Sequence, residues 1–402
     1  MGSRSGTGDP REALGATATP EQVCGWVRAN LADHLAGSVN PGAAGRDRDE
    51  QPLPAAAFQR AAELGLFGYL LPHELGGSGG DRRTFGLLLE QLGYFCDEIE
   101  YGSLLSLYAD IPTVVAEAGR PELIERYVLP MSQGRCFGTF AYTERTDPFD
   151  LHCRVTRTTG GYVLDGEKCL QTGGHLAHVF LTYVRNEQDD LQVFLVERTD
   201  PGVLVEPVAT TGFRAAGLTR LTLRQVTLPS DRLLVRVDGL SHAQRFLNHR
   251  RLFVVCPMVG RMKALIESCA AHLSGVVRYG RPLTQQQAVQ AKLGRMLIRY
   301  EGARALLHDA LARWAGVHNP LHEPVVSAAK YTIVENAIAV AMDAVGLAGW
   351  LGYSRELPYE RYLRGFMAGI AGQTAQDVLE LLLGDEVVAR AEFAQHMEGA
   401  VR

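Results

Sequence analysis

The chain has 402 residues, of which 46% are hydrophobic and 21% are charged, a balance typical of a soluble globular protein with room for two or three domains. Its formal net charge of −5 gives no basic field, which excludes nucleic acid as an expected partner, and no apolar run is long enough to span a bilayer. Nothing at the N-terminus reads as a signal peptide, and the seven scattered cysteines lack CxxC spacing. These features favour reduced thiols, a cytoplasmic location and no metal site.

The first part of the chain is expected to be helical. Residues 1–19 are rich in Gly, Ser, Arg and Ala and are predicted to be a disordered lead. Thr19 followed by Pro20 is a typical helix start, whereas the Gly, Pro and charged residues of Asn40–Pro54 indicate a loop. Apolar spacing predicts further helix at Ala55–Leu64, Phe85–Phe95, Ile111–Gly119 and Glu122–Tyr127. Residues 20–135 are therefore interpreted as an N-terminal helical domain.

A β-rich block follows, and its clearest segment is Gly160–Gly174, GGYVLDGEKCLQTGG. Two turns, at Gly160-Gly161 and at Asp165-Gly166, bracket short alternating runs, which predicts a hairpin in an antiparallel sheet. Similar strand-like runs lie upstream and downstream. Residues 136–238 are therefore predicted to form a middle β domain of ordinary size.

The last part of the chain is again helical. Long apolar periodicities predict helices at Arg251–Val277, Thr284–Gly316, Val325–Val345 and Thr374–Leu383. Four long helices with short connections suggest an antiparallel bundle over residues 239–402. The expected fold class is α+β.

Several segments carry a resemblance to a known family. They are FGTFAYTE at Phe137–Glu144, Lys168–Thr172, the turn Arg278–Leu283 with Gln287, and ELPYERYLR at Glu356–Arg364. Over roughly Glu21–Glu386 the chain resembles the acyl-CoA dehydrogenase family. The resemblance implies an N-terminal helical domain, a middle β-barrel or sandwich domain and a C-terminal four-helix bundle. It also implies FAD, an acyl thioester substrate on CoA or on an acyl carrier protein, and a homodimer or homotetramer.

The same resemblance implies which residues contact the cofactor. They are Tyr142, Thr143, Leu170, Thr172, Arg278, Tyr279, Gln287, Gly349, Thr374 and Gln376. Other roles fit some of them as well. Thr143 and Thr172 also suit ordinary strand positions, and Thr374 also suits a helix cap.

The chain departs from the family where the catalytic base is expected. Family members remove the proton α to the thioester carbonyl with a Glu in a Tyr-Glu-Gly-Thr motif, and here either Gly372 or Gln373 stands at that position. Some members place the base on the first long helix of the bundle, at the position of Arg250. His249 beside it is the candidate replacement base, and Arg250 with Arg251 could instead bind a phosphate or form a salt bridge.

Other departures point the same way. Leu170 stands where an aromatic residue normally flanks the flavin, and Pro148-Phe149-Asp150 replaces Gly-Ser-Asp. The favoured interpretation is a specialised FAD-dependent oxidoreductase of secondary metabolism, with an undefined electron acceptor. The alternatives are a flavin monooxygenase on the same fold, or a redox-neutral lyase or cyclase, or a non-catalytic protein with a decayed flavin site.

Overall fold

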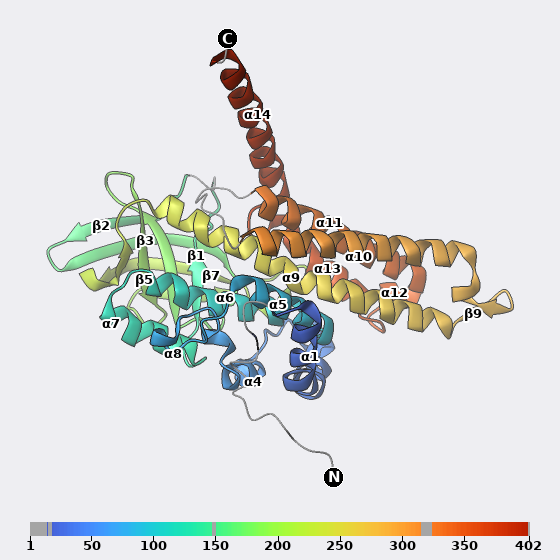
Figure 1. The fold of residues 1–402 in the computed structure, drawn as a ribbon. Helices are drawn as coiled ribbons and strands as arrows, with labels where there is room; N and C mark the ends of the chain where they lie inside the picture. Colours follow the sequence, from blue (N-terminus) through green and yellow to red (C-terminus); the bar gives the residue numbers. More distant parts are fainter. Residues whose placement is uncertain (1–13, 15–17, 147–149, 315–323, 401–402) are drawn as a thin grey trace. The chain divides into compact units, whose positions relative to one another are not determined.

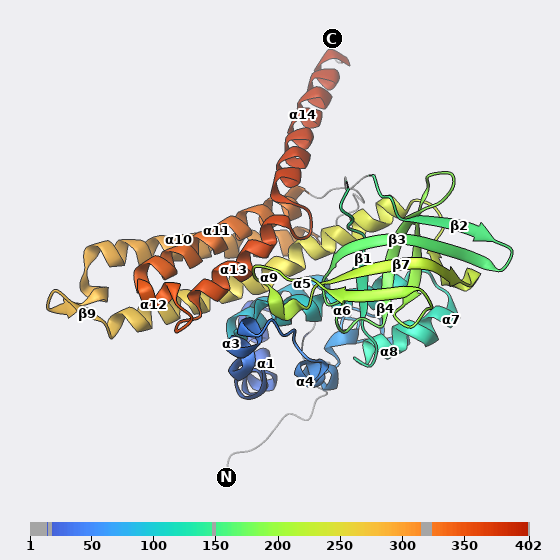
Figure 2. The same ribbon diagram turned by 180° about the vertical axis from the view of Figure 1, so that it is seen from behind.

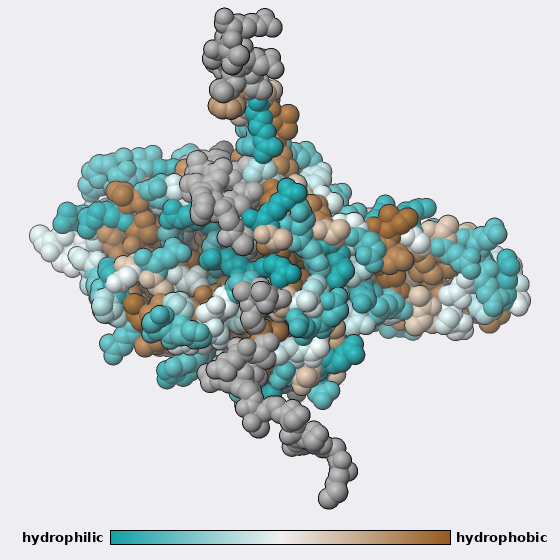
Figure 3. Space-filling view, viewed as in Figure 1, coloured by the Kyte–Doolittle hydropathy of each residue, from teal (hydrophilic) through white to brown (hydrophobic). Residues whose placement is uncertain are grey.

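The computed structural model describes residue 14 and residues 18–146, 150–314 and 324–400, with side chains described up to residue 393. The fold is mixed α+β and divides into two compact units, Met1–Ala243 and Gln244–Arg402 (Figures 1 and 2). Hydrophilic side chains cover most of the face shown in Figure 3, with apolar patches between them. Most of the expected lead, and the departures at Pro148 and Phe149, lie outside the described residues.

The first unit opens with short helices around two longer ones. Thr19 caps the first helix as predicted, because its hydroxyl accepts from the Gln22 amide at 3.3 Å and its own amide donates to the Gln22 side chain at 2.8 Å. The α-helices are α1 (Pro20–Asn30), α2 (Ala32–His34), α3 (Ala43–Arg48), α4 (Gln59–Glu63), α5 (Arg82–Phe95), α6 (Ile99–Ala116), α7 (Pro121–Leu123) and α8 (Leu129–Ser132). Short 3-10 or π segments join them at Leu35–Val39, Asn40–Gly42, Ala55–Phe58, Leu66–Gly68, His73–Leu75 and Ile124–Val128.

The loop predicted at Asn40–Pro54 is wrong over its first half, which is the helical segment ending in α3. The Asn40 amide donates to the Phe95 carbonyl and its side-chain oxygen accepts from the Asp97 amide, each at 2.9 Å. Arg46 forms an ion pair with the buried Glu98 at 2.6 Å. These partners lie about 50 residues away along the chain, so local composition could not reveal them.

The central helix of this unit is α6, which is buried along nearly its whole length. It starts twelve residues before the predicted Ile111, and it buries the carboxylate of Glu100. It packs against α5, α8 and the first strand. The Tyr108 hydroxyl donates to the Gly173 carbonyl at 3.0 Å, so α6 also fixes the chain just after the third strand.

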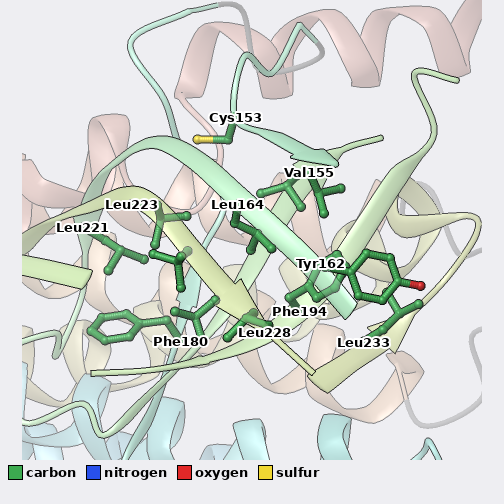
Figure 4. Packing of buried hydrophobic residues seen from close by; sticks show 14 of the residues in the cluster. Cys153, Val155, Tyr162, Leu164, Phe180, Phe194, Leu221, Leu223, Leu228 and Leu233 are labelled. Carbon is green, nitrogen blue, oxygen red and sulfur yellow. The ribbon is translucent and has the colours of Figure 1, made fainter. Parts of the chain in front are cut away.

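One sheet forms the rest of the unit. Its strands are β1 (Gly138–Ala141), β2 (Arg154–Thr158), β3 (Gly161–Gln171), β4 (Val179–Arg185), β5 (Leu191–Glu197), β6 (Val203–Pro207), β7 (Thr219–Leu228) and β8 (Leu233–Val235). The strand order is β6-β7-β3-β2-β4-β5-β8, and β1 pairs with β4. The sheet is mixed rather than purely antiparallel, because β1 and β2 both run parallel to β4. Figure 4 shows Leu164, Phe180, Phe194 and Leu223 converging in its core.

The hairpin prediction is half confirmed. The turn that joins β2 to β3 in antiparallel register lies at Thr159-Gly160, one residue before the predicted Gly160-Gly161, and Gly161 already pairs with Thr158. Asp165-Gly166 is not a turn, however, because β3 continues through it with a register shift against β7. Gly166 has φ +141°, and a β-carbon there would collide with Cys153, so this bulge needs glycine.

The second unit is a helical bundle. Its elements are α9 (Gly239–Ser274, which begins in the first unit), β9 (Val277–Arg278), β10 (Arg281–Pro282), α10 (Gln287–Trp314), α11 (Pro324–Ala348), α12 (Trp350–Tyr353), α13 (Tyr359–Ala371) and α14 (Gln376–Ala400). Trp314 of α10 packs on Phe253 of α9 at 5.5 Å between ring centroids, and Val334 of α11 lies against Gly369 of α13.

The helix predicted at Thr374–Leu383 corresponds to α14, but the fourth helix that packs in the bundle is α13. α13 packs against α9 and α11, with the Arg261 guanidinium donating to the Tyr362 hydroxyl at 3.1 Å. α14 contacts α11 near its own start and then extends away from the other helices (Figures 1 and 2). Its residues beyond Leu379 are exposed or half-buried as far as side chains are described. The periodic pattern at Thr374–Leu383 indicated a helix but not what it packs against.

By length and composition, α11 is apolar enough to cross a membrane, which is weak evidence by itself. Its Ile333, Val334 and Ala337 are completely buried in the bundle, and Lys330 and Glu335 interrupt it, which is typical of a core helix. Within the described part of the chain, no three His, Cys, Asp or Glu side chains group as metal ligands. None of the seven cysteines, all of which the structure describes, forms a disulfide.

Candidate active site

In the first unit the structure brings together two segments that carry candidate cofactor-contacting residues. We call these two segments the wall. Tyr142 and Thr143 follow β1, and Leu170 and Thr172 lie at the end of β3. The Cys169 amide donates to the Thr143 carbonyl at 2.7 Å, and the buried Thr139 hydroxyl donates to the Thr172 carbonyl at 2.6 Å. The two segments are therefore joined by hydrogen bonds from both sides.

A buried ion pair anchors this wall. Lys168 Nζ lies 2.5 Å from Glu144 Oε1, with the two side chains 0% and 5% exposed, and it also donates to the Tyr142 carbonyl at 3.1 Å. Glu144 accepts further hydrogen bonds from the backbone amides of His152 and Cys153, at 2.5 and 3.1 Å. Burial opposes ionisation of Glu144, but Lys168 and these amides outweigh it, so its net pKa lies below the ordinary value. The sequence interpretation quoted both residues only as motif letters and missed the pair.

The exposed parts of the wall are the hydroxyls of Thr143 and Thr172 and the side chain of Leu170. Neither the Thr143 nor the Thr172 hydroxyl has a hydrogen-bond partner among the residues that the structure describes. Leu170 is 48% exposed and has φ +56°, a conformation that turns its backbone out of the β3 ladder. Two available hydroxyls beside an exposed apolar side chain suit a cofactor with polar edges and an apolar face.

Tyr142 contributes differently from the expectation. Its ring is buried, stacked on Phe140 at 5.8 Å and packed against Tyr183 at 5.3 Å. The ring therefore belongs to the core, and only the backbone of this residue reaches the wall.

In the second unit, three of the candidates form one strained turn between α13 and α14. Gly372 ends α13, and Gln373 and Thr374 follow with φ of +54° and +81°. Positive φ is uncommon for any residue with a side chain and is unfavourable for a β-branched one such as Thr374. Neither Gly372 nor Gln373 carries a group that accepts a proton at neutral pH.

Two buried cations hold this turn. Arg251 of α9 donates to the Thr374 hydroxyl from Nη2 at 2.9 Å and from Nε at 3.1 Å. Lys330 of α11 donates to the Gly369 carbonyl at 2.6 Å and to the Thr374 carbonyl at 2.7 Å. Burial lowers the pKa of Arg251 to about 10, and burial together with Arg251 lowers the pKa of Lys330 to about 7. Nothing in the sequence interpretation singled out Lys330, because a lone lysine on an apolar helix stripe gives no local signal.

The other two catalytic candidates do not meet this turn. His249 packs edge-on against Trp314 of α10 at 5.0 Å between ring centroids. It precedes Arg251 by two residues, which turns its side chain by about 200° around the helix. Arg250 is buried, with 1% of its surface exposed. Gln376 is also buried and donates to Glu335 of α11 at 3.1 Å, so its amide links α14 to α11.

The remaining cofactor candidates lie at the other end of the bundle. Arg278 and Tyr279 belong to the β9–β10 hairpin, where Tyr279 is 96% exposed, and Gln287 begins α10. Gly349 has φ +62° and joins α11 to α12. Since α13 returns from this end to the turn beside Lys330, the second unit holds two separate groups of candidate residues (Figure 1).

Comparison with known proteins gives a consistent result. Three family models match in order: "Acyl-CoA dehydrogenase, N-terminal domain" at residues 25–135, the middle domain at 139–226 and the C-terminal domain at 237–383. Benzylmalonyl-CoA dehydrogenase from Aromatoleum aromaticum is 27% identical over 357 residues, which cover 87% of this chain and 93% of that protein.

Solved structures agree at the level of the fold. The prolyl acyl carrier protein oxidase AnaB has a TM-score of 0.85 at 22% identity, covering 92% of this chain and 100% of that one. A glutaryl-CoA dehydrogenase from Mycobacterium smegmatis in complex with FADH2 has a TM-score of 0.84 at 21% identity, covering 92% and 94%. The chain belongs to the acyl-CoA dehydrogenase family, a family of FAD-dependent oxidoreductases.

Proposed function

We propose that this protein is an FAD-dependent oxidoreductase that removes two hydrogens from an acyl group held as a thioester. The observation that carries the proposal is the wall of the first unit, where the Thr143 and Thr172 hydroxyls have no partner among the described residues and their segments are fixed together. Such a wall is expected to be retained only where it still holds a cofactor.

The chain's own residues would bind and orient. Thr143 and Thr172 would donate to the polar edge of the cofactor, and Leu170 would cover part of its apolar face. The Lys168–Glu144 pair keeps both segments in place without reorganisation when the cofactor binds. Bound FAD supplies the chemistry that accepts a hydride from the acyl chain.

Because Gly372 or Gln373 stands where the family has its Glu, the proton that leaves the acyl group needs a different acceptor. His249 is the candidate on α9 that carries an imidazole, whereas the guanidinium of Arg250 could only orient or bind an anion. Replacing His249 by Gln is therefore the first test of the proton acceptor. Thioester oxidation that survives this change within about twofold would assign the proton to the substrate or to solvent.

Two carriers of the thioester are candidates, CoA and an acyl carrier protein. Benzylmalonyl-CoA dehydrogenase supports the first by sequence, and the prolyl acyl carrier protein oxidase supports the second by fold. A carrier-bound intermediate of secondary metabolism fits the unusual base position best, and we place the protein in the cytoplasm.

We also propose a homodimer or homotetramer. In the second unit the candidate cofactor residues lie at opposite ends of the bundle, and one end is rich in exposed aromatic residues. Trp350 is 68% exposed, and Tyr353 and Tyr279 are more so, at 83% and 96%. Exposed apolar surface of this kind marks an interaction site.

The experiment is the ultraviolet-visible spectrum of the purified protein, followed by anaerobic titration with an acyl-CoA and with the same acyl group on a carrier protein. A flavin spectrum that bleaches with either thioester is the expected result. Bound flavin that does not bleach, with product formed only in the presence of a reductase and oxygen, would favour the monooxygenase. A colourless protein that takes up no added FAD would leave the redox-neutral or non-catalytic alternative.

A further inference from the structure

The strained turn at Gly372–Thr374 has a feature that the proposed function does not use. Lys330 is completely buried in the second turn of α11, yet its partners are two backbone carbonyls and no carboxylate. An ammonium group buried in this way is costly unless its hydrogen bonds serve the structure around it.

We propose that Lys330 is the positioning residue of this turn: its ammonium group holds Gln373 and Thr374 in their left-handed conformation, and the turn loosens when that group loses its proton. The inference rests on the proposed function only for its catalytic consequence, because the turn occupies the position of the family's base.

The two carbonyls that accept from Lys330 belong to the end of one helix and the approach to the next. Gly369 lies in the last turn of α13, where backbone carbonyls have no partner within the helix. Thr374 lies before the first turn of α14. Lys330 Nζ bridges these two carbonyls, at 2.6 and 2.7 Å, and so sets the distance between the end of one helix and the start of the next.

The backbone of the turn is strained at two residues. Gln373 and Thr374 both have positive φ, which costs on the order of 1–3 kcal/mol for each residue. The surroundings must therefore impose this backbone. Arg251 fixes the Thr374 side chain and Lys330 fixes its carbonyl, so the same residue is held from both sides.

The charge near Lys330 lowers its pKa further than burial alone does. From α9, Arg251 is the charged group that acts on Lys330, and α13 and the turn face it with carbonyls. Carboxylates of α11 and α14, namely Glu335, Asp377 and Glu380, act instead on Tyr331, the next residue along α11. Lys330 therefore titrates near neutral pH, and its proton doubles the strength of the hydrogen bonds that it donates.

The test is amide hydrogen exchange, measured by mass spectrometry on the full-length protein as purified, for peptides that cover residues 369–378. The variants are Lys330→Met, which keeps the length but removes the charge, and Tyr331→Phe as the matched control. Tyr331 donates to Glu380 at 2.6 Å, so the control also removes a link between α11 and α14 but leaves the turn alone.

We expect exchange in these peptides to be roughly ten- to a hundredfold faster in Lys330→Met and unchanged in Tyr331→Phe. In the wild-type protein, protection of the same peptides should fall about tenfold between pH 6 and pH 8.5 after correction for intrinsic exchange rates. The wild-type measurement needs no variant, so it stands even if Lys330→Met fails to fold.

Equal protection in the wild type at both pH values would overturn the proposal, as would a Lys330→Met effect spread evenly over the second unit. Neither readout depends on flavin or substrate, so a protein that binds no FAD would defeat the proposed function and leave this inference standing. If thioester oxidation is observed, the pH profile of kcat should lose its limb near neutrality in Lys330→Met, while KM changes less than about twofold.

Discussion

The two units each bury one lysine completely, and the two lysines have opposite surroundings. Lys168 in the first unit faces the carboxylate of Glu144, whereas Lys330 in the second unit faces only carbonyls and lies near Arg251. Burial lowers the pKa of both lysines, but Glu144 opposes this shift at Lys168 and Arg251 adds to it at Lys330. The partner of a buried lysine therefore decides whether that lysine forms a permanent anchor or a titrating one.

The largest effect is expected from breaking the anchor in the first unit. Glu144→Gln leaves Lys168 buried without a counter-charge, which should lower the free energy of unfolding by about 3–5 kcal/mol. Denaturant unfolding followed by circular dichroism measures it. The double variant Lys168→Met, Glu144→Leu should recover most of the lost free energy of unfolding. A Glu144→Gln protein as stable as the wild type would show that the ion pair is not an anchor.

The second prediction concerns the titrating lysine and the pH dependence of stability. With a folded-state pKa of about 7 and an unfolded value near 10.4, the unfolded chain binds more protons than the folded chain between these values. Global unfolding exposes Lys330 to water, so its free energy should rise with pH across this window, by on the order of 1 kcal/mol per pH unit, and this contribution is lost as the pH falls through 7. The local opening of the turn proposed above leaves Lys330 buried without its carbonyl partners, so it has the opposite pH dependence. Lys330→Met should lack the rise. Parallel curves for the two proteins would show that Lys330 does not titrate there.

The third prediction is smaller because it removes neutral groups from a wall that the anchor keeps in place. Thr143→Val and Thr172→Val should each weaken FAD binding by about 1 kcal/mol, or roughly fivefold, without changing the melting temperature. Fluorescence titration of the apoprotein with FAD measures this. Thr156→Val, on an exposed position of β2, is the control and should bind FAD as the wild type does. Equal affinities in all variants would remove the two hydroxyls from the cofactor site.

The fourth and smallest effect comes from placing a carboxylate on the turn at Gly372–Thr374. Gln373→Glu places a carboxylate on the turn that Lys330 and Arg251 hold, so it should raise the pKa of Lys330 and flatten the pH dependence described above. It should also give slow bleaching by a simple acyl-CoA. Gly372→Glu is a poorer choice, since a β-carbon there would lie 2.9 Å from the Ala368 carbonyl. If the free energy of unfolding of Gln373→Glu depends on pH as in the wild type, the new carboxylate does not lie near Lys330 or Arg251.

Some of the fold follows from local signals that need no distant partner. The Thr19 cap with Gln22, the turn between β2 and β3 to within one residue, and the long apolar periodicities of α10 and α11 were predictable because residues a few positions apart determine them. The helix at Asn40–Arg48, the burial of Glu100 and the choice of α13 as a bundle helix were not. Each of these depends on side chains far along the chain.

The candidate site divides in the same way. Motif resemblance alone brought attention to Thr143, Thr172, Gly372 and Gln373, and the structure places these in two well-defined segments. The same resemblance grouped His249 with the base position, but the helical rotation of α9 directs Arg251, and not His249, to the turn. Lys330 had no signal in the sequence because its two acceptors are backbone carbonyls, 39 and 44 residues away.

The sequence by itself determined the family, the three-part α-β-α order and the absence of a carboxylate at Gly372 and Gln373, since composition, periodicity and motif spacing are properties of the chain alone. Only the tertiary structure decided that Lys168 has a counter-charge and Lys330 has none. The physical reason is that the cost of burying a charge depends on which groups lie within a few ångströms, and folding brings those groups from distant parts of the chain.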